Sequence, residues 1–497
     1  MDLVLDDNGP LYLQLARALK EAMAAGRLAN GTRLPSSREL AYDLNLSRTT
    51  VVAAYEHLRA EGFIAGRVGS GSYVTSPWTT PVRSPPVRRA VVAQSDYSRR
   101  LREFSDIGNI PGRRPPGMRY AFQFGVPMVN TALTAQWVRE LARAAPYVQP
   151  NYPRIQGLPA LREAVARHVG RTRGVACSAD DVLIVGGTQQ ALSLIARVLL
   201  DVGDEVALEE PHYFTARTIL QVHGARLVGV PVDADGMQVD RLPDPAVKLT
   251  YVTPSHQFPT GAVLSHERRL ALLEYARLGS GWIVEDDYDG EFRHDRQPVR
   301  ALQELDRDGR VLYVGSFSKT LFPSLRLGYI VMPPGLKDDL IAAKWTDDFG
   351  SPPLDQAALA NFITSGAYDR HLRQVTRKLA ERRQLLRSSL QAQCGDRLEI
   401  MESHSGMHLV AWIRDMPVEE GEALIRAAAE RKLALYSIAP CYLQPPQRTG
   451  LIMGFSAMSP GEIRDAVALF AKCLALFPRR KAGERGRPAL YLARSSG

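Results

Sequence analysis

A lysine follows a β-rich run in the segment VLYVGSFSKTLFPSLRLGY. The run ends in Ser316 and Ser318, and Lys319 comes next. Arg326 follows seven residues after the lysine. A lysine amine becomes nucleophilic where burial or nearby cations keep part of it uncharged, and hydroxyls with a guanidinium can hold a phosphate beside it. A lone lysine in such a segment is more often a solvated surface residue, so this pattern needs companions elsewhere.

Adjacent acids follow a second apolar run, in GWIVEDDY. This places Asp286 at the C-terminal end of an expected strand, where α/β folds bind ligands. A carboxylate there can face a ring nitrogen, and Tyr288 can form a hydrogen bond with a ring hydroxyl. Acids at a strand end also serve as helix caps or metal ligands.

A third segment, DVLIVGGTQQ, runs from an expected strand through glycines into a helix start. The amides exposed there suit a phosphate. Tyr213, in EEPHYFTAR, falls where an aromatic ring can cover a planar group. A glycine turn into a helix and a buried tyrosine are each common without a ligand.

Together these segments supply what pyridoxal phosphate requires. That cofactor needs a lysine for its aldehyde, an acid facing its ring nitrogen, a phosphate cradle and something flat over the ring. Lys319 would provide the first and Asp286 the second. An acid that keeps the ring nitrogen protonated makes the ring an electron sink.

The N-terminal segment has the pattern of a DNA reader. A first helix is expected from the leucines that recur at helical spacing from Leu11 onward. Ser36 and Glu39 form a capping box that opens a second helix. Ser47 can cap a third helix, which would bury Tyr55.

The expected third helix begins with Arg48, Thr49 and Thr50 exposed in its first turn. A helix N-terminus attracts phosphate, and these side chains can reach base edges in the major groove. Residues 63–74 read as two short strands around a glycine-rich tip, a wing that can approach a phosphate backbone. The alternative is a three-helix packing domain with surface arginine and threonine.

The string RLPSSRELAYDLNLSRTTVVAAYEHLRAEGFIAGRVGSGSYV resembles the GntR-type winged helix along its whole length. The resemblance includes the leading LPSSREL, the SRTTV turn and the GSGSYV wing. It implies binding to double-stranded operator DNA, with these residues as contacts: Arg33, Ser36, Arg38, Arg48, Thr49, Thr50, Gly69 and Gly71.

From about Phe122 to Phe477 the chain resembles the fold-type I aminotransferases. The phrases NYPRIQGLPALREAVA, VGGTQQAL, EEPHY, TPSHQFPTG, EDDYDGEF and SFSKTLFPSLRLGY, after a GntR-type head, resemble the MocR family of regulators. The resemblance implies that Lys319 forms the Schiff base with pyridoxal phosphate, that Asp286 meets the ring nitrogen and that Tyr213 stacks on the ring.

The same resemblance implies a phosphate cradle and a dimer. Tyr152 matches a tyrosine that reaches the phosphate of the other subunit, so a homodimer with shared sites is expected. The residues implied around the phosphate are Gly187, Thr188, Gln189, Ser316, Ser318 and Arg326.

Two positions bear on turnover and on the ligand. Aminotransferases carry an asparagine beside the proline in the segment matching HQFPTG, and here Phe258 stands in its place. The change removes a hydrogen bond that tunes the cofactor, so we expect a domain that senses more than it catalyses. His256 and Gln257 either compensate or are satisfied loop residues.

Arg448 falls near the place of an arginine that binds an effector carboxylate in the related enzymes. A surface arginine is the alternative.

The composition predicts a multidomain chain. An α+β winged helix-turn-helix is expected over 1–76, and an α/β aminotransferase-like domain with a mostly parallel central sheet over 120–478. The prolines of 77–119 exclude a regular helix, so this stretch reads as a linker. Residues 479–497 form a basic tail that we expect to be disordered.

Net charge, cysteine spacing and the length of apolar runs limit the partners and the cellular location that we expect. A net charge of +9 over 497 residues makes a polyanion a reasonable partner. The four cysteines are widely spaced, and His404 and His408 lack further ligands, so no metal site is expected. The first residues are acidic where a signal peptide is basic, and no apolar run approaches the ~20 residues that span a bilayer. We expect a cytoplasmic bacterial protein without membrane contact.

The predicted function is a dimeric, DNA-binding transcriptional regulator. Its pyridoxal-phosphate domain would sense an amino compound through aldimine exchange at Lys319. In one alternative, pyridoxal phosphate itself is the effector and the regulator controls vitamin B6 synthesis. In another, the chain is an active aminotransferase with an accessory DNA-binding domain, against which Phe258 argues.

Overall fold

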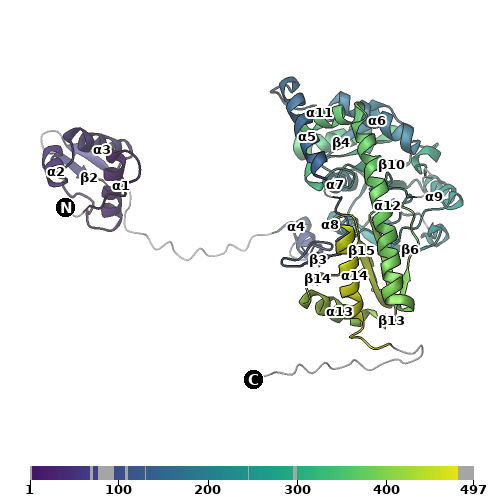
Figure 1. The fold of residues 1–497 in the computed structure, drawn as a ribbon. Coiled ribbons are helices and arrows are strands. Elements are labelled where there is room, and N and C mark those ends of the chain that lie inside the picture. Colours follow the sequence, from purple (N-terminus) through teal and green to yellow (C-terminus); the bar gives the residue numbers. More distant parts are fainter. Residues whose placement is uncertain are drawn as a thin grey trace. The chain divides into compact units, whose positions relative to one another are not determined.

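Two compact units, Met1–Ala93 and Gln94–Gly497, make up the chain (Figure 1). The computed structural model describes most of both units. The described residues are 3–67, 71–75, 94–106, 110–128, 130–244, 246–294 and 299–479.

The first unit contains helices and a two-stranded hairpin in the predicted order. Its elements are α1 (Leu11–Ala24), α2 (Ser37–Asp43), α3 (Arg48–Ala60), β1 (Ile64–Arg67) and β2 (Gly71–Val74). The two strands are antiparallel, with Ile64 opposite Val74. Leu15, Leu40 and Leu58, one from each helix, are fully buried in one apolar core.

The predicted caps of α2 and α3 are confirmed. The Ser36 hydroxyl accepts a hydrogen bond from the Glu39 amide at 3.2 Å, and the Glu39 carboxylate accepts one from the Ser36 amide at 2.8 Å. The Ser47 hydroxyl accepts from the Thr50 amide at 3.1 Å. These bonds satisfy amides that a helix start otherwise leaves unpaired, so they fix where each helix begins.

The second unit alternates strands and helices. Its elements, in chain order, are α4 (Asp96–Phe104), β3 (Tyr120–Ala121), α5 (Thr131–Ala144), α6 (Pro159–Arg173), β4 (Val182–Val185), α7 (Thr188–Leu199), β5 (Glu205–Glu210), α8 (Phe214–His223), β6 (Arg226–Asp233), β7 (Gly236–Met237), β8 (Leu249–Val252), α9 (His266–Leu278), β9 (Trp282–Asp287), β10 (Val311–Ser316), β11 (Gly328–Val331), α10 (Lys337–Asp348), α11 (Pro353–Thr364), α12 (Ala367–Cys394), β12 (Leu398–Ile400), β13 (His408–Pro417), α13 (Val418–Glu430), β14 (Leu433–Ala434), β15 (Arg448–Gly454) and α14 (Pro460–Leu474).

The large sheet is mostly parallel, as predicted. Its strand order is β4-β11-β10-β9-β8-β5-β6-β7. The five central strands, β10, β9, β8, β5 and β6, are parallel neighbours, whereas β11 and β7 pair antiparallel. The C-terminal ends of parallel strands meet at one edge of a sheet, and ligands bind outside that edge.

Helices cover both faces of this sheet. Along β4, Val182 and Ile184 belong to one apolar cluster with residues of α6 and α11, while Leu183 and Val185 belong to another with residues of α7 and α10. Alternate residues of a strand point to opposite faces, so β4 is buried on both. A smaller antiparallel sheet, β12-β13-β15, lies near the long helix α12 and the C-terminal helix α14 (Figure 1).

The sequence predicted no regular helix in residues 77–119, and this prediction is wrong, because α4 lies in that stretch. The nine residues of α4 include no proline, and the Ser95 hydroxyl caps the helix by accepting from the Ser98 amide at 3.1 Å. The helix packs on α8, where Arg100 donates to the Val222 carbonyl at 2.8 Å and the Tyr97 ring meets the His223 ring edge-on at 5.6 Å. These contacts place α4 in the second unit.

Several other predictions can be compared only with part of the chain. The linker residues 76–93 and the tail residues 480–497 lie outside the described residues. Within the described part, no helix combines the length and the apolar character needed to cross a membrane. The described residues also contain no group of three or more His, Cys, Asp or Glu side chains arranged to hold a metal ion.

Replacement of Tyr55 by phenylalanine should destabilise the first unit. The Tyr55 side chain lies in the core, as predicted, and its hydroxyl donates to the Pro35 carbonyl at 2.9 Å, which ties α3 to the residues before α2. Loss of this bond should cost about 0.5–1.5 kcal/mol. The urea midpoint of the first unit, followed in the intact chain, measures the loss. Tyr42→Phe is the matched control because Tyr42 is 88% exposed; equal effects of the two changes would contradict the assignment.

Candidate functional site

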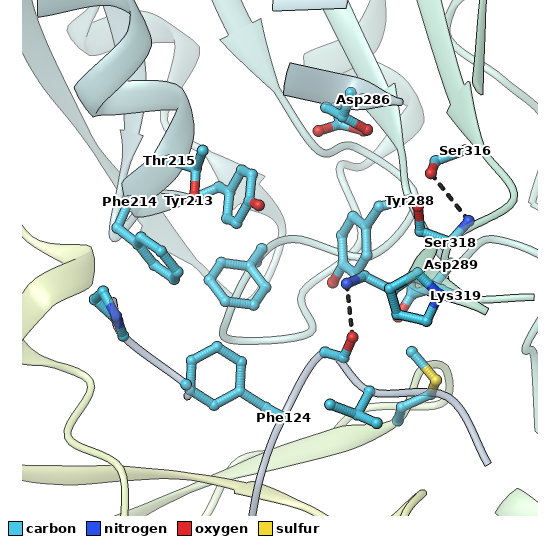
Figure 2. A pocket seen from close by; sticks show the side chains of 18 of the residues that line it. Phe124, Tyr213, Phe214, Thr215, Asp286, Tyr288, Asp289, Ser316, Ser318 and Lys319 are labelled. Atoms are coloured by element: carbon cyan, nitrogen blue, oxygen red, sulfur yellow. Dashed lines mark hydrogen bonds between the residues drawn. The ribbon is translucent and has the colours of Figure 1, made fainter. Parts of the chain in front are cut away.

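One cavity lies at the C-terminal ends of the central strands. Its volume is about 430 Å³. Figure 2 shows Asp286 and Tyr288, at the end of β9, and Lys319, after β10, around it. The predicted cofactor residues that line it are Thr188, Gln189, Tyr213, Asp286, Tyr288, Ser316, Ser318, Lys319 and Arg326.

Lys319 follows the end of β10 and points into the cavity. Its amine donates a hydrogen bond to the Gly125 carbonyl at 2.7 Å (Figure 2). Burial lowers the pKa of Lys319 below its ordinary value, although the carboxylates of Asp289 and Asp286 oppose the shift. A lysine with a lowered pKa is more often uncharged and can act as a nucleophile.

Asp286 lies near the end of β9 and is 3% exposed. One carboxylate oxygen accepts a hydrogen bond from the Tyr251 hydroxyl at 2.7 Å, and the other, Oδ1, has no hydrogen-bond partner among the described residues. Burial raises the pKa of Asp286 to about 7. The side chain therefore presents an unsatisfied acceptor, which suits a protonated nitrogen.

An anion cradle lies beside the lysine. Helix α7 begins at Thr188, directly after Gly187, which has a φ of +97°. A side chain at Gly187 would begin 3.5 Å from the Arg326 guanidinium, so the glycine leaves that cation open toward the helix start. The Ser316 hydroxyl accepts from the Ser318 amide at 3.1 Å. Amides, hydroxyls and a guanidinium that converge in this way suit a phosphate.

Aromatic rings form much of the remaining wall. The ring of Phe258 lies 5.5 Å from that of Tyr213 and 5.9 Å from that of Tyr288, both nearly perpendicular to it. Phe124 lies 6.0 Å from Phe258 and 6.5 Å from Phe214. A planar ligand would meet these faces and edges, which is favourable for aromatic contacts.

His256 and Gln257 lie behind the cavity wall and bond within the protein. Neither lines the cavity. The His256 ring bonds with Asp289 at 3.0 Å and with the Tyr288 hydroxyl at 2.8 Å through one nitrogen, and with Ser403 at 3.0 Å through the other. The Gln257 amide donates to the Pro211 carbonyl at 2.6 Å. Both are satisfied loop residues, which was one of the two alternatives that the sequence left open.

Three predicted site residues do not line this cavity: Gly187, which immediately precedes α7, Arg448 and Tyr152. Arg448 forms an ion pair with Glu399 at 2.7 Å and lies over the Trp412 ring, and its expected role at an effector carboxylate stays a prediction. Tyr152 is 81% exposed, with its ring 5.1 Å from that of Phe349. Because its expected role involves another subunit, that role stays a prediction.

Sequence reasoning missed several lining residues. Phe124, Gly125, Phe214, Met407 and His408 are prominent among them. His408 is buried, its ring contacts the Pro259 carbonyl at 3.0 Å, and burial lowers its pKa to about 4, so it is neutral. Apolar residues and satisfied loop residues carry no chemical signature, and only the folded order of the chain brings them to the cavity.

The predicted DNA contacts lie on the first unit. Arg48 and Thr49 are exposed at the start of α3. A hollow of about 280 Å³ brings together Arg33, Ser36 and Gly71 from the predicted set. A side chain at Gly71 would begin 3.2 Å from the Arg33 guanidinium, so this glycine keeps the cation open.

The remaining predicted DNA contacts are Arg38, Thr50 and Gly69. Arg38 is exposed on α2. The Thr50 hydroxyl, like that of Thr49, lies 2.7 Å from the Ser47 hydroxyl, so both threonines take part in the helix cap. Gly69 lies outside the described residues.

Comparisons with known proteins agree with the family expected for each unit. Residues 11–74 match the family model of bacterial regulatory proteins of the gntR family, and residues 129–469 match that of aminotransferase class I and II. The chain is 38% identical over 474 residues to the probable rhizopine catabolism regulatory protein MocR of Rhizobium meliloti, covering 94% of each chain.

Two further relatives extend the comparison. The pyridoxine biosynthesis transcriptional regulator PdxR of Corynebacterium glutamicum is 29% identical over 467 residues, covering 92% of this chain and 96% of that protein. The multiple substrate aminotransferase of Thermococcus profundus has a similar fold, with a TM-score of 0.67 at 23% identity over 78% of this chain and 97% of that one. The chain therefore belongs to the GntR family of bacterial regulators and, within it, to the MocR type, in which an aminotransferase class I and II domain follows the winged helix.

Proposed function

We propose that this DNA-binding regulator uses pyridoxal phosphate to sense an amino compound. The observation that carries the proposal is the convergence of Lys319, Asp286 and the Gly187–Arg326 cradle on one cavity of the second unit. In the same chain, the first unit presents Arg48 and Thr49 at the start of the expected recognition helix.

The residues of the cavity fit pyridoxal phosphate. The unpartnered Oδ1 of Asp286 would accept a hydrogen bond from the ring nitrogen. The start of α7, with Ser316, Ser318 and Arg326, would hold the phosphate, and Tyr213 would cover the ring. When bound, the cofactor supplies an aldehyde that condenses with primary amines and an electron-withdrawing ring.

The response would depend on competition at Lys319. An amino compound and the Lys319 amine would compete for the same aldehyde. The lysine amine would then be free to return to the Gly125 carbonyl, with which it bonds at 2.7 Å. An effector shifts an equilibrium only if it interacts differently with two states, and this change in the partner of Lys319 provides such a difference.

A homodimer is part of the proposal. The exposed rings of Tyr152, Phe349 and Trp345 lie in succession, with centroids 5.1 Å and 6.3 Å apart. Their exposed fractions are 81%, 45% and 53%. Exposed aromatic groups of this kind are typical of surfaces that bind another protein, and Tyr152 is the residue expected to reach a partner subunit.

Pyridoxal phosphate as the effector itself is the second candidate. The relative that favours it is the pyridoxine biosynthesis regulator PdxR, similar over 92% of this chain. Under this proposal operator binding would respond to the cofactor alone, with no further amine. Catalytic turnover is disfavoured because Phe258 has no polar atom to offer the cofactor; steady-state transamination of an ordinary amino acid would revive it.

Replacement of Arg48 by alanine should weaken operator binding. A base contact of an arginine contributes about 1–3 kcal/mol, so the affinity should fall by roughly 5- to 150-fold. Fluorescence anisotropy with DNA from upstream of the gene, at one fixed salt concentration, measures it. Arg17→Ala is the control because Arg17 pairs with Asp6 on the first unit. Equal losses in both variants would indicate general charge and argue against base recognition.

Replacement of Lys319 by alanine should abolish the response to amines. The variant should also lose the absorbance band that a Schiff base gives the bound cofactor. Operator binding is measured with and without an amine in parallel with the spectrum. Lys472→Ala, at an exposed lysine of α14, should behave as the unchanged chain. A response in Lys319→Ala that equals the original one would exclude competition at this lysine.

Replacement of Asp286 by asparagine should change how stability depends on pH. Burial raises the pKa of Asp286 from 3.8 to about 7, so ionisation of the folded form is disfavoured. The stability contributed by its protonated form is present below pH 4 and is lost as pH rises toward 7. The asparagine variant lacks this loss, so cofactor-free Asp286→Asn should gain stability relative to the original chain between pH 5 and pH 8.

Urea midpoints at the two pH values measure this difference. Asp338→Asn, at an exposed position of α10, is the matched control and should show no such gain. If the stability difference for Asp286→Asn were the same at both pH values, the burial argument would be wrong.

A further inference from the structure

One wall of the cavity comes from a short segment near the start of the second unit. Ile110, Pro111, Gly112 and Arg113 all line it, between α4 and β3. No residue of this segment was expected at the site. The wall therefore contains a cation, Arg113, whose role is not assigned.

The segment is held firmly against the cavity at Gly112. The Gln123 amide donates to the Gly112 carbonyl at 3.0 Å. Gly112 has a φ of +80°, and a side chain there would begin 2.8 Å from the Phe124 ring. Only glycine combines this backbone conformation with this close approach, so the position of Arg113 at the cavity is set by its neighbour.

The three arginine and lysine residues that line the cavity have different surroundings. Lys319 bonds with the Gly125 carbonyl, and Arg326 lies against Gly187 in the expected phosphate cradle. The Arg113 side chain is exposed and makes no hydrogen bond or ion pair within the described residues. Arg448, in contrast, is paired with Glu399 away from the cavity.

We propose that Arg113 binds the carboxylate of the effector, which is then an amino acid with an apolar side chain. This inference rests on the proposed cofactor-dependent sensing. A guanidinium binds a carboxylate through two parallel hydrogen bonds. The rings of Phe124, Phe214 and Phe258 supply an apolar surface for the body of the ligand.

The position of Arg113 gives this contact a second consequence. Helix α4, which precedes this segment in the second unit, contacts α8 through Tyr97 and Arg100. The first residue of α8, Phe214, lines the same cavity. A ligand bound by Arg113 therefore contacts the segment between α4 and β3 at one point and the helix that supports α4 at another.

The test compares two amines that differ only in the carboxylate. The intact chain, loaded with pyridoxal phosphate, is titrated with L-phenylalanine and separately with phenethylamine, and the initial change in cofactor absorbance gives an apparent Kd for each. The original chain should prefer phenylalanine by about tenfold or more, the range of a charge-assisted hydrogen bond. Arg113→Gln should reduce this preference to near one.

Two variants serve as controls. Arg114→Gln changes the adjacent arginine, whose guanidinium donates to the Met118 carbonyl at 2.7 Å and does not line the cavity. Arg448→Gln changes the arginine paired with Glu399. Both variants should keep the preference for phenylalanine. An unchanged cofactor spectrum in Arg113→Gln verifies that this exposed substitution leaves the cavity intact.

The outcomes separate this inference from the one on which it rests. If no cofactor band forms in the original chain, the proposed sensing fails and the role of Arg113 fails with it. If the band forms but the original chain shows no preference, or Arg113→Gln keeps it, only the role of Arg113 is overturned. An equal loss in Arg114→Gln would also overturn it, since net charge would then explain the effect.

Discussion

Burial of a carboxylate at the end of a parallel strand is the constraint on which the second unit depends. Asp286 is almost inaccessible, and only one of its oxygens is bonded, by the Tyr251 hydroxyl. A buried charge is costly unless it binds a proton or faces a cation. The same low-polarity surroundings lower the pKa of Lys319. An acid with a raised pKa near an amine with a lowered one is typical of functional sites and suits the proposed cofactor.

The strand that carries Asp286 keeps its other acids out of the cavity. Successive side chains of a strand point to opposite faces, so Glu285 and Asp287 share the face that Asp286 does not. Asp287 accepts hydrogen bonds from Arg173 at 2.6 Å and from the Tyr313 hydroxyl at 2.5 Å. Glu285 accepts from the amides after Ala301, where it caps a short turn. A run of three acids therefore supplies one carboxyl that lines the cavity and two structural ones.

Short-range rules predicted much of this structure, and long-range contacts account for what they missed. The capping box at Ser36 and the place of Lys319 after a strand depend on a few neighbouring residues, so the sequence was sufficient. The position of Arg448 depends on Glu399, 49 residues earlier, which no local pattern indicates. Helix α4 was missed because the prolines around it dominated the composition of the stretch, whereas its stability comes from packing on α8. The cavity wall at Arg113 likewise follows from the folded path of the chain.

Phe258 is the position on which the proposal of sensing without efficient turnover depends. Its ring lies edge-on to Tyr213 and Tyr288 and contributes apolar contact without a donor or acceptor. Catalysis needs polar groups that are better matched to the transition state than to the bound ligand, whereas sensing needs only different affinities in two states. Loss of a polar group therefore reduces turnover more than it reduces binding. Phe258 also lies against Phe124, on which Gly112 rests, so it belongs to the aromatic cluster that holds the Arg113 segment at the cavity.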